Sequence, residues 1–296
     1  MIQYYIYFHN WWNGFYNFDA NNINFFIKLL SYTKLSNFVI VYNPSDANVI
    51  IENLSPNDNL IFYDKWKYRI NFIGEPQTSN YKNYDLVLTG ANNIFNVVDL
   101  PVSVMYILGN NLYNILNHRR NITKIPEKFC CFIVSNPKCL TRNKMFELLN
   151  NYKKVDSCGR FANNYNDSII NLNWWSKEYI EFISQYKFMI CFENTKMLNY
   201  STEKIVNAYL ANIIPIYWSS NSISNLFNMD SLLFLENEQD DNSFQNVINK
   251  VIELDNNDNK YLEFINRQPF NNTNIEYWDN NYTFEKLGNK INSILK

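Results

Sequence analysis

Residues 187–218 read KFMICFENTKMLNYSTEKIVNAYLANIIPIYW, and this stretch predicts the fold. The apolar runs at 187–194 and 213–218 are typical of buried strands. Between them, Ser201 or Thr202 is a good helix N-cap, and apolar residues follow at helical spacing: Ile205, Val206, Tyr209 and Leu210. A strand, a helix and a second strand in this order predict a parallel sheet.

Lys204 stands in the first turn of this predicted helix, where the helix dipole disfavours a cation. An anion bound at the helix start would reverse the local field, so free backbone N–H groups together with Lys204 predict a pocket for phosphate. Glu203 beside it is placed to accept hydrogen bonds from sugar hydroxyls. The alternative is that this Glu-Lys pair is ordinary solvated surface.

The rest of the chain repeats the alternation of strands and helices. In the first half, strands are predicted at 2–8, 37–42, 47–53, 59–64, 71–75 and 85–90, with a helix at 22–30. The polar stretch 109–128 is the best linker candidate. In the second half we expect a strand at 130–135 and helices at 141–152, 178–186, 243–254 and 283–296. The pattern predicts an α/β protein with two Rossmann-like domains facing a cleft, residues 1–122 and 123–296.

The bulk composition excludes several classes of protein. The chain has 296 residues, 47% of them hydrophobic, and a net charge of -2, so a broad basic face for nucleic acid is not expected. Its apolar runs fall short of the ~20 residues of a membrane span. The N-terminus lacks the basic region and cleavage site of a signal peptide, and we expect a cytoplasmic protein.

Cysteine and acid usage gives no sign of a metal site. The five cysteines have no C-x-x-C spacing, which indicates buried reduced thiols. With only two histidines, a zinc cluster is not credible. The acidic runs at 239–242 and 255–259 are predicted to be solvated.

An ordered set of motifs resembles a known family. Phe192-Glu-Asn, Tyr200-x-Thr-Glu-Lys and Pro215-x-x-Trp resemble the C-terminal signature of the α-1,3/4-fucosyltransferases, glycosyltransferase family 10. Weaker similarities lie upstream: HNWW (9–12), FIGEP (72–76), VSNPKCLTRNKMFELL (134–149) and KVDSCGR (154–160). The resemblance implies the two-domain architecture called GT-B, with the acceptor side and the base in the first domain and GDP-fucose in the second.

The resemblance also implies a role for individual residues. Glu75 is the expected general base. The expected donor-binding residues are Arg142 and Lys204 on the diphosphate and Asn194, Tyr200 and Glu203 on the rest of GDP-fucose. Trp11 and Trp12 would face the acceptor sugar, although two aromatic residues after a strand are equally often core.

The implied reaction is inverting transfer of L-fucose from GDP-fucose to a glycan, expected at the 3-hydroxyl of an N-acetylglucosamine- or glucose-type residue. No cofactor or metal is expected, because the sequence has no Asp-x-Asp element and Arg142 and Lys204 can stabilise the departing diphosphate. Two alternatives stay open. Ser201 and Ser219, which depart from the family pattern, allow another nucleotide sugar, and the chain could also be an inactive glycan-binding relative.

Overall fold

The computed structural model describes residues 2–11, 15–16, 22–53, 66–76, 81–90, 95–165 and 172–296. The chain forms two compact units. Residues 1–112, 198–200 and 276–296 make up the first, and 113–197 and 201–275 the second. The expected boundary at residue 122 is therefore wrong by about ten residues, and the C-terminal helix belongs to the first unit, not the second.

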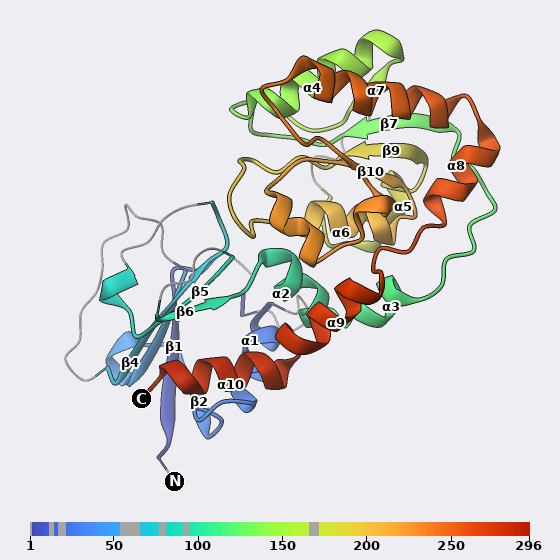
Figure 1. Cartoon of the computed structure of the whole chain (residues 1–296). Coiled ribbons are helices and arrows are strands. Elements are labelled where there is room, and N and C mark those ends of the chain that lie inside the picture. The colour runs from blue at the N-terminus through green and yellow to red at the C-terminus, as the bar shows by residue number, and fades with distance from the viewer. Residues whose placement is uncertain are drawn as a thin grey trace. The chain divides into compact units, whose positions relative to one another are not determined.

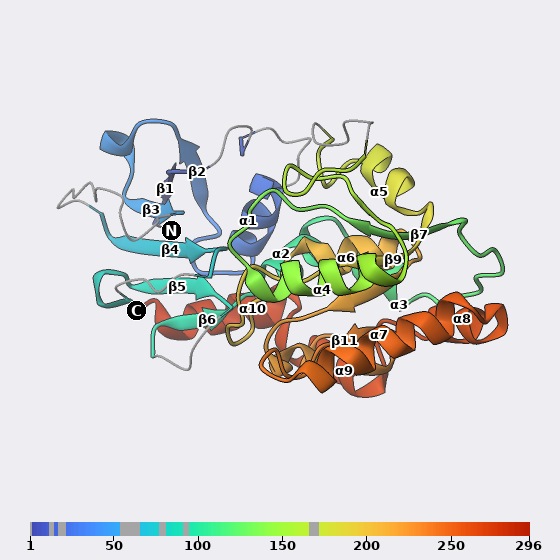
Figure 2. The same cartoon turned by 90° about the horizontal axis from the view of Figure 1, so that it is seen from above.

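The first unit contains a six-stranded parallel sheet in the order β2-β1-β3-β4-β5-β6. Figure 2 shows β4, β5 and β6 side by side in that order. The strands are β1 (Tyr4–His9), β2 (Phe38–Val41), β3 (Val49–Glu52), β4 (Tyr68–Ile73), β5 (Leu86–Thr89) and β6 (Val97–Asp99). Five of the six predicted strands are confirmed; the sixth, at 59–64, lies outside the described residues. The sequence missed β6.

Three helices of the first unit pack together: α1 (Asn22–Ser31), α2 (Val102–Gly109) and α10 (Phe284–Ile294). Helix α10 lies against α1, and the Asn292 side chain accepts a hydrogen bond from Lys34 N at 2.7 Å. Gly288 allows this approach, since a Cβ there would lie 2.4 Å from the Tyr32 carbonyl oxygen. These contacts explain why the end of the chain joins the first unit.

The second unit contains a five-stranded parallel sheet in the order β11-β10-β9-β7-β8. Helices α4 and α7 lie on one side of it, and α5 and α6 on the other (Figure 1). The strands are β7 (Lys128–Phe132), β8 (Val155–Ser157), β9 (Tyr186–Ile190), β10 (Ile214–Tyr217) and β11 (Leu233–Phe234). Its helices are α3 (Tyr113–Asn117), α4 (Leu140–Tyr152), α5 (Lys177–Ile183), α6 (Glu203–Leu210), α7 (Asp241–Asp255) and α8 (Asp258–Ile265). Helix α9 (Asn272–Asn281) begins in the second unit and ends in the first.

The prediction of an α/β protein built from parallel sheets is thus confirmed in both units. The sequence did not predict several elements: α3, which lies inside the predicted linker, and α2, α8, α9 and β11. Short 3₁₀ turns in the described part of the chain lie at Pro44–Asp46, Tyr81–Asn83, Asn221–Asn225 and Met229–Ser231.

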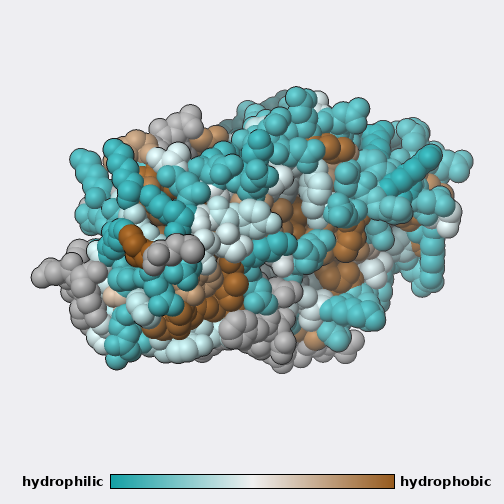
Figure 3. All heavy atoms as spheres, turned by 90° about the horizontal axis from the view of Figure 1, so that it is seen from below, coloured by the Kyte–Doolittle hydropathy of each residue, from teal (hydrophilic) through white to brown (hydrophobic). Residues whose placement is uncertain are grey.

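The five cysteines are buried and free, as predicted. One acidic prediction is wrong: Asp255 is only 8% exposed, because Lys153 and Lys187 each pair with its carboxylate at 2.9 Å. The face of the molecule in Figure 3 is mostly hydrophilic, with hydrophobic atoms in separate patches. Among the residues described here, no helix has the length and apolar character to cross a membrane.

Candidate active site

The carboxyl end of β9 brings the Phe192-Glu-Asn motif beside the start of α6. Beyond β9 the chain stays extended next to β10, since Cys191 N donates to Ile216 O at 2.8 Å and Glu193 N to Trp218 O at 3.1 Å. Thr202, one of the two residues that the sequence offered, is the N-cap residue of α6. In parallel α/β sheets this edge is where ligands bind.

Glu193 is the centre of the hydrogen bonding at this edge. Its side chain is fully buried and accepts from Thr202 N at 2.8 Å, the Thr202 hydroxyl at 2.9 Å, Lys204 Nζ at 3.0 Å and the Tyr217 hydroxyl at 2.9 Å. A carboxylate offers about four lone-pair sites, so these donors fill it. Burial and the Glu193 charge raise the pKa of Tyr217 well above its usual value, so Tyr217 remains a donor.

Lys204 is not ordinary solvated surface, because its ammonium is already bound by side chains of the protein. Its ammonium donates to Glu193 and, at 2.8 Å, to the Thr202 hydroxyl, and lies 3.9 Å from a Glu203 oxygen. Burial lowers the pKa of Lys204, but the Glu193 and Glu203 carboxylates outweigh it and the net shift is upward. Lys204 is therefore charged at neutral pH. Since an ammonium has three protons, the bonds to Glu193 and Thr202 leave one that no acceptor among the described residues takes within hydrogen-bond distance.

The Thr202 hydroxyl is used by Glu193 and Lys204 and makes no capping bond to the helix. The first N–H groups of α6 therefore receive no side-chain cap from Thr202. They keep the positive end of the helix dipole close to the Lys204 ammonium. Buried Glu193 thus holds the Lys204 ammonium close to the N-terminus of α6. The two positive charges lie together, and this arrangement suits an anionic ligand.

Arg142 and Asn194 form a second pair at the same edge. Arg142 lies on α4 and is only 2% exposed; its Nη1 donates to Asn194 Oδ1 at 2.9 Å and its Nη2 to Asn136 O at 2.8 Å. Its charge acts to lower the pKa of Lys204, which means that the two cations interact. The second unit thus gathers four predicted donor-binding residues: Arg142, Asn194, Glu203 and Lys204.

The remaining predicted site residues lie in the first unit. Glu75 is exposed on a bend just after β4. Tyr200 is buried, with 5% of its surface exposed. Trp11 is half-buried and stacks on Phe15 and Phe72, with ring centroids 4.1 and 5.3 Å apart. Trp12 lies outside the described residues.

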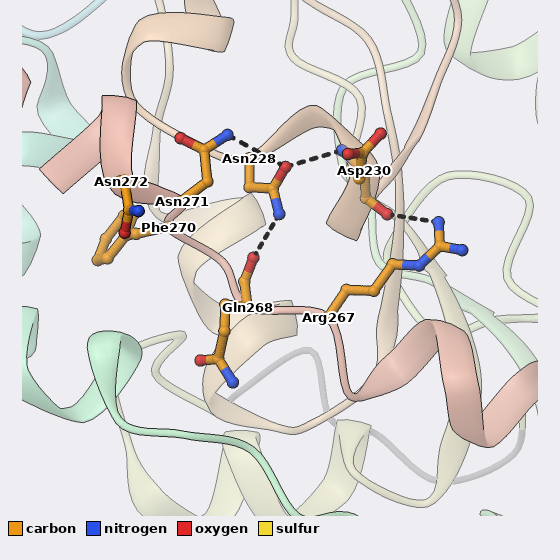
Figure 4. Close-up of a pocket in the computed structure, with 7 residues that line it drawn as sticks. All are labelled: Asn228, Asp230, Arg267, Gln268, Phe270, Asn271 and Asn272. Carbon is orange, nitrogen blue, oxygen red and sulfur yellow. Dashed lines mark hydrogen bonds between the residues drawn. The ribbon is translucent and has the colours of Figure 1, made fainter.

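A surface pocket of the second unit is separate from these residues. It has a volume of about 710 Å³ and is lined by Asn228, Asp230, Arg267, Gln268, Phe270, Asn271 and Asn272 (Figure 4). The Asn228 side chain donates to Gln268 O at 3.0 Å and accepts from Asp230 N at 3.1 Å. These amides join two loops, and none of the predicted site residues lines the pocket.

Comparison with known proteins identifies the family. Residues 124–294 match the model of the glycosyltransferase family 10 (fucosyltransferase) C-terminal region. The fold, two parallel α/β units, agrees with the GT-B architecture of glycosyltransferases. This chain belongs to glycosyltransferase family 10.

Its relatives are fucosyltransferases. The chain is 30% identical to the alpha-(1,3)-fucosyltransferase FucT of Helicobacter pylori over 251 residues, 83% of this chain and 48% of that protein. It is 31% identical to human 4-galactosyl-N-acetylglucosaminide 3-alpha-L-fucosyltransferase 9 over 159 residues, 52% of this chain and 41% of that protein. The chain thus spans about half or less of the length of these relatives.

Solved structures share the fold. An alpha1,3-fucosyltransferase crystallised with GDP matches 99% of this chain and 90% of its own, with a TM-score of 0.73 and 23% identity. One crystallised with GDP-fucose matches the same shares, with a TM-score of 0.69 and 22% identity.

Proposed function

We propose that this protein transfers L-fucose from GDP-fucose to a hydroxyl of a glycan acceptor, the 3-hydroxyl of an N-acetylglucosamine- or glucose-type residue, with inversion at the sugar. Family membership supports the reaction class. The observation that carries the donor site is the Lys204 ammonium, held by the buried Glu193 at the start of α6 with one proton to spare.

The donor side of the reaction needs positive charge where the diphosphate departs, because GDP gains negative charge as the glycosidic bond breaks. Lys204 donates its third proton to a phosphate oxygen, and the N-terminus of α6 adds its dipole. Arg142 orients Asn194 and adds a second positive charge. Glu203 and Tyr200 complete the donor site. We propose that these groups replace a metal ion.

The acceptor side needs one base. We propose that Glu75 takes the proton of the attacking hydroxyl while the fucosyl–phosphate bond breaks on the opposite side of the sugar, and this geometry inverts the anomeric centre. Its position on an exposed bend, just beyond the carboxyl end of β4, leaves it accessible to a glycan. Trp11 packs against aromatic residues of the first unit but is only half-buried, so contacts of Trp11 and of Trp12 with the acceptor both stay predictions.

A donor panel tests the proposal against its alternatives. Thermal-shift titration with GDP-, UDP- and CMP-sugars should show stabilisation by GDP-fucose above the others, because only a ligand of the native state raises the melting temperature. Initial-rate transfer to β-galactoside and N-acetylglucosamine acceptors then tests turnover. Preference for a UDP- or CMP-sugar would refute the donor assignment, and GDP-fucose binding without transfer to any acceptor would favour a glycan-binding relative.

A further inference from the structure

Two adjacent tryptophans of the second unit are exposed at a tight turn. Trp174 and Trp175 are 36% and 43% exposed, and neither is among the proposed donor- or acceptor-binding residues. Their ring centroids lie 4.8 Å apart and the ring planes meet at 89°. The face of one ring and its perpendicular neighbour therefore form an aromatic corner that is partly exposed.

The backbone holds this corner in a fixed conformation. Ser176 N donates to Asn173 O at 2.8 Å, which closes a turn with the two tryptophans at its central positions. Ser176 then caps α5, since its hydroxyl accepts from Tyr179 N at 3.2 Å. The exposed rings thus project from an ordered turn, and little conformational entropy is lost when a ligand binds.

The turn is also attached to the helix of the candidate donor site. Asn207, only 1% exposed on α6, donates through its side-chain amide to Trp174 O at 2.9 Å. Asn207 follows Glu203 by four residues, so the two lie on the same face of α6 and about 6 Å apart along its axis. The aromatic corner is therefore anchored one helical turn from Glu203 and Lys204.

We infer that Trp174 and Trp175 form a stacking site for a pyranose ring of the acceptor glycan. A pyranose has a face of C–H groups, which carry partial positive charge and pack on the negative face of an aromatic ring. Its rim of hydroxyls needs polar neighbours, and Asn173, Lys177 and Glu178, which are close to the two tryptophans in sequence, are all exposed. The assignment of this pyranose to the acceptor glycan rests on the proposed function.

The size of the site favours a sugar over a protein partner. Two rings exposed by about two fifths offer roughly 120–200 Å² of mostly apolar surface, given a full side-chain area of about 150–250 Å² each. A stable protein interface buries about 800 Å² on each partner. Leu172, also 36% exposed, adds some apolar surface before the rings, and the exposed polar residues Lys177 and Glu178 follow them on α5. An apolar surface of this extent matches one or two sugar rings.

The test compares Trp174→Ala and Trp175→Ala with Phe95→Ala, a matched control that removes an 86% exposed aromatic side chain from the first unit. Glycan binding is measured directly, by calorimetry with N-acetyllactosamine, its oligomers and N-acetylglucosamine oligomers, and by KM in transfer assays. Because an aromatic contact is lost, each tryptophan variant should weaken glycan affinity and raise the acceptor KM about three- to tenfold. Affinity for GDP-fucose, kcat and all properties of the control should stay unchanged.

Separate outcomes distinguish this inference from the proposed function. Glycan binding that depends on Trp174 and Trp175 without any fucose transfer would uphold the stacking site and refute the enzyme. Wild-type glycan affinity and acceptor KM in the Trp174→Ala/Trp175→Ala double variant would overturn the stacking site, as would wild-type protein that binds no oligosaccharide of the panel. Loss of GDP affinity with unchanged glycan affinity would assign the rings to the guanine base and overturn it too.

Discussion

Glu193→Gln tests the role of the buried carboxylate at the start of α6. The substitution keeps shape and volume but replaces a carboxylate with about four lone-pair sites by an amide oxygen with two. Four donor groups converge on Glu193 in the structure, so at least two of them lose their acceptor, and the new NH₂ group faces other donors. Lys204 also loses its closest counter-charge.

The number of lost hydrogen bonds gives the expected decrease in the free energy of unfolding for Glu193→Gln. A hydrogen bond to a charged group contributes about 1.5–3 kcal/mol, so losing two gives roughly 3 kcal/mol, the lower end of the range for breaking a buried ion pair. Lys204 softens the effect, because its side chain is 23% exposed and retains Glu203 nearby. In a unit of this size the melting temperature should fall by roughly 6–12 °C.

Urea unfolding measures the effect as a lower midpoint with an unchanged m-value. Glu181→Gln is the matched control, because Glu181 is an exposed acid that pairs with Lys177 at 3.2 Å and its loss should change stability by less than about 0.5 kcal/mol. The double variant with Lys204→Met should lose less than the sum of the single changes. Glu193→Gln with the stability of wild type would refute the account of this site.

Three further predictions concern binding, turnover and pH. Lys204→Ala should weaken GDP binding by ~1.5–3 kcal/mol in calorimetry, and an unchanged affinity would remove Lys204 from the donor site. Glu75→Gln should retain GDP-fucose affinity while turnover drops by roughly 10²–10⁴, the range for a positioned base; near-normal turnover would point to another acid of the first unit. Burial raises the pKa of Cys131 well above its usual value and that of Cys158 to about 11. Unfolded thiols ionise near ~8.5, so the stability that these thiols contribute should be full below that pH and decline as the pH rises above it; unfolding free energies that do not fall between pH ~8 and ~10 would contradict this.

The sequence predicted the elements whose patterns are local. The strands at 37–42 and 85–90 follow from apolar runs, and the start of α6 at Ser201 or Thr202 from the residue types found before helices, although Thr202 makes no side-chain capping bond. Strand β11 has only two residues, and α2 is apolar along most of its length. Neither therefore shows the periodic alternation of apolar and polar residues from which elements are predicted. The return of α10 to the first unit depends on its packing against α1, far away in the sequence, which no local pattern reveals.

The same limit applies to the candidate site. The sequence placed Glu193 at a strand end and Lys204 in a helix turn, but their pairing across eleven residues depends on how the strand and helix meet. One sequence pattern could have predicted this pair. It is an acidic residue at the end of a buried strand, followed shortly by a Thr and a Lys at the start of a helix. Asp255 was misjudged for a similar reason: Lys153 and Lys187 reach it from α4's end and from β9.

The central claim is that Lys204, Arg142 and the start of α6 stabilise the departing GDP without a metal ion. The most direct test is the initial rate of fucose transfer from GDP-fucose by the wild-type protein, measured with and without EDTA on the acceptor panel. The account predicts equal rates in both conditions. A rate that collapses in EDTA and recovers with manganese would contradict it.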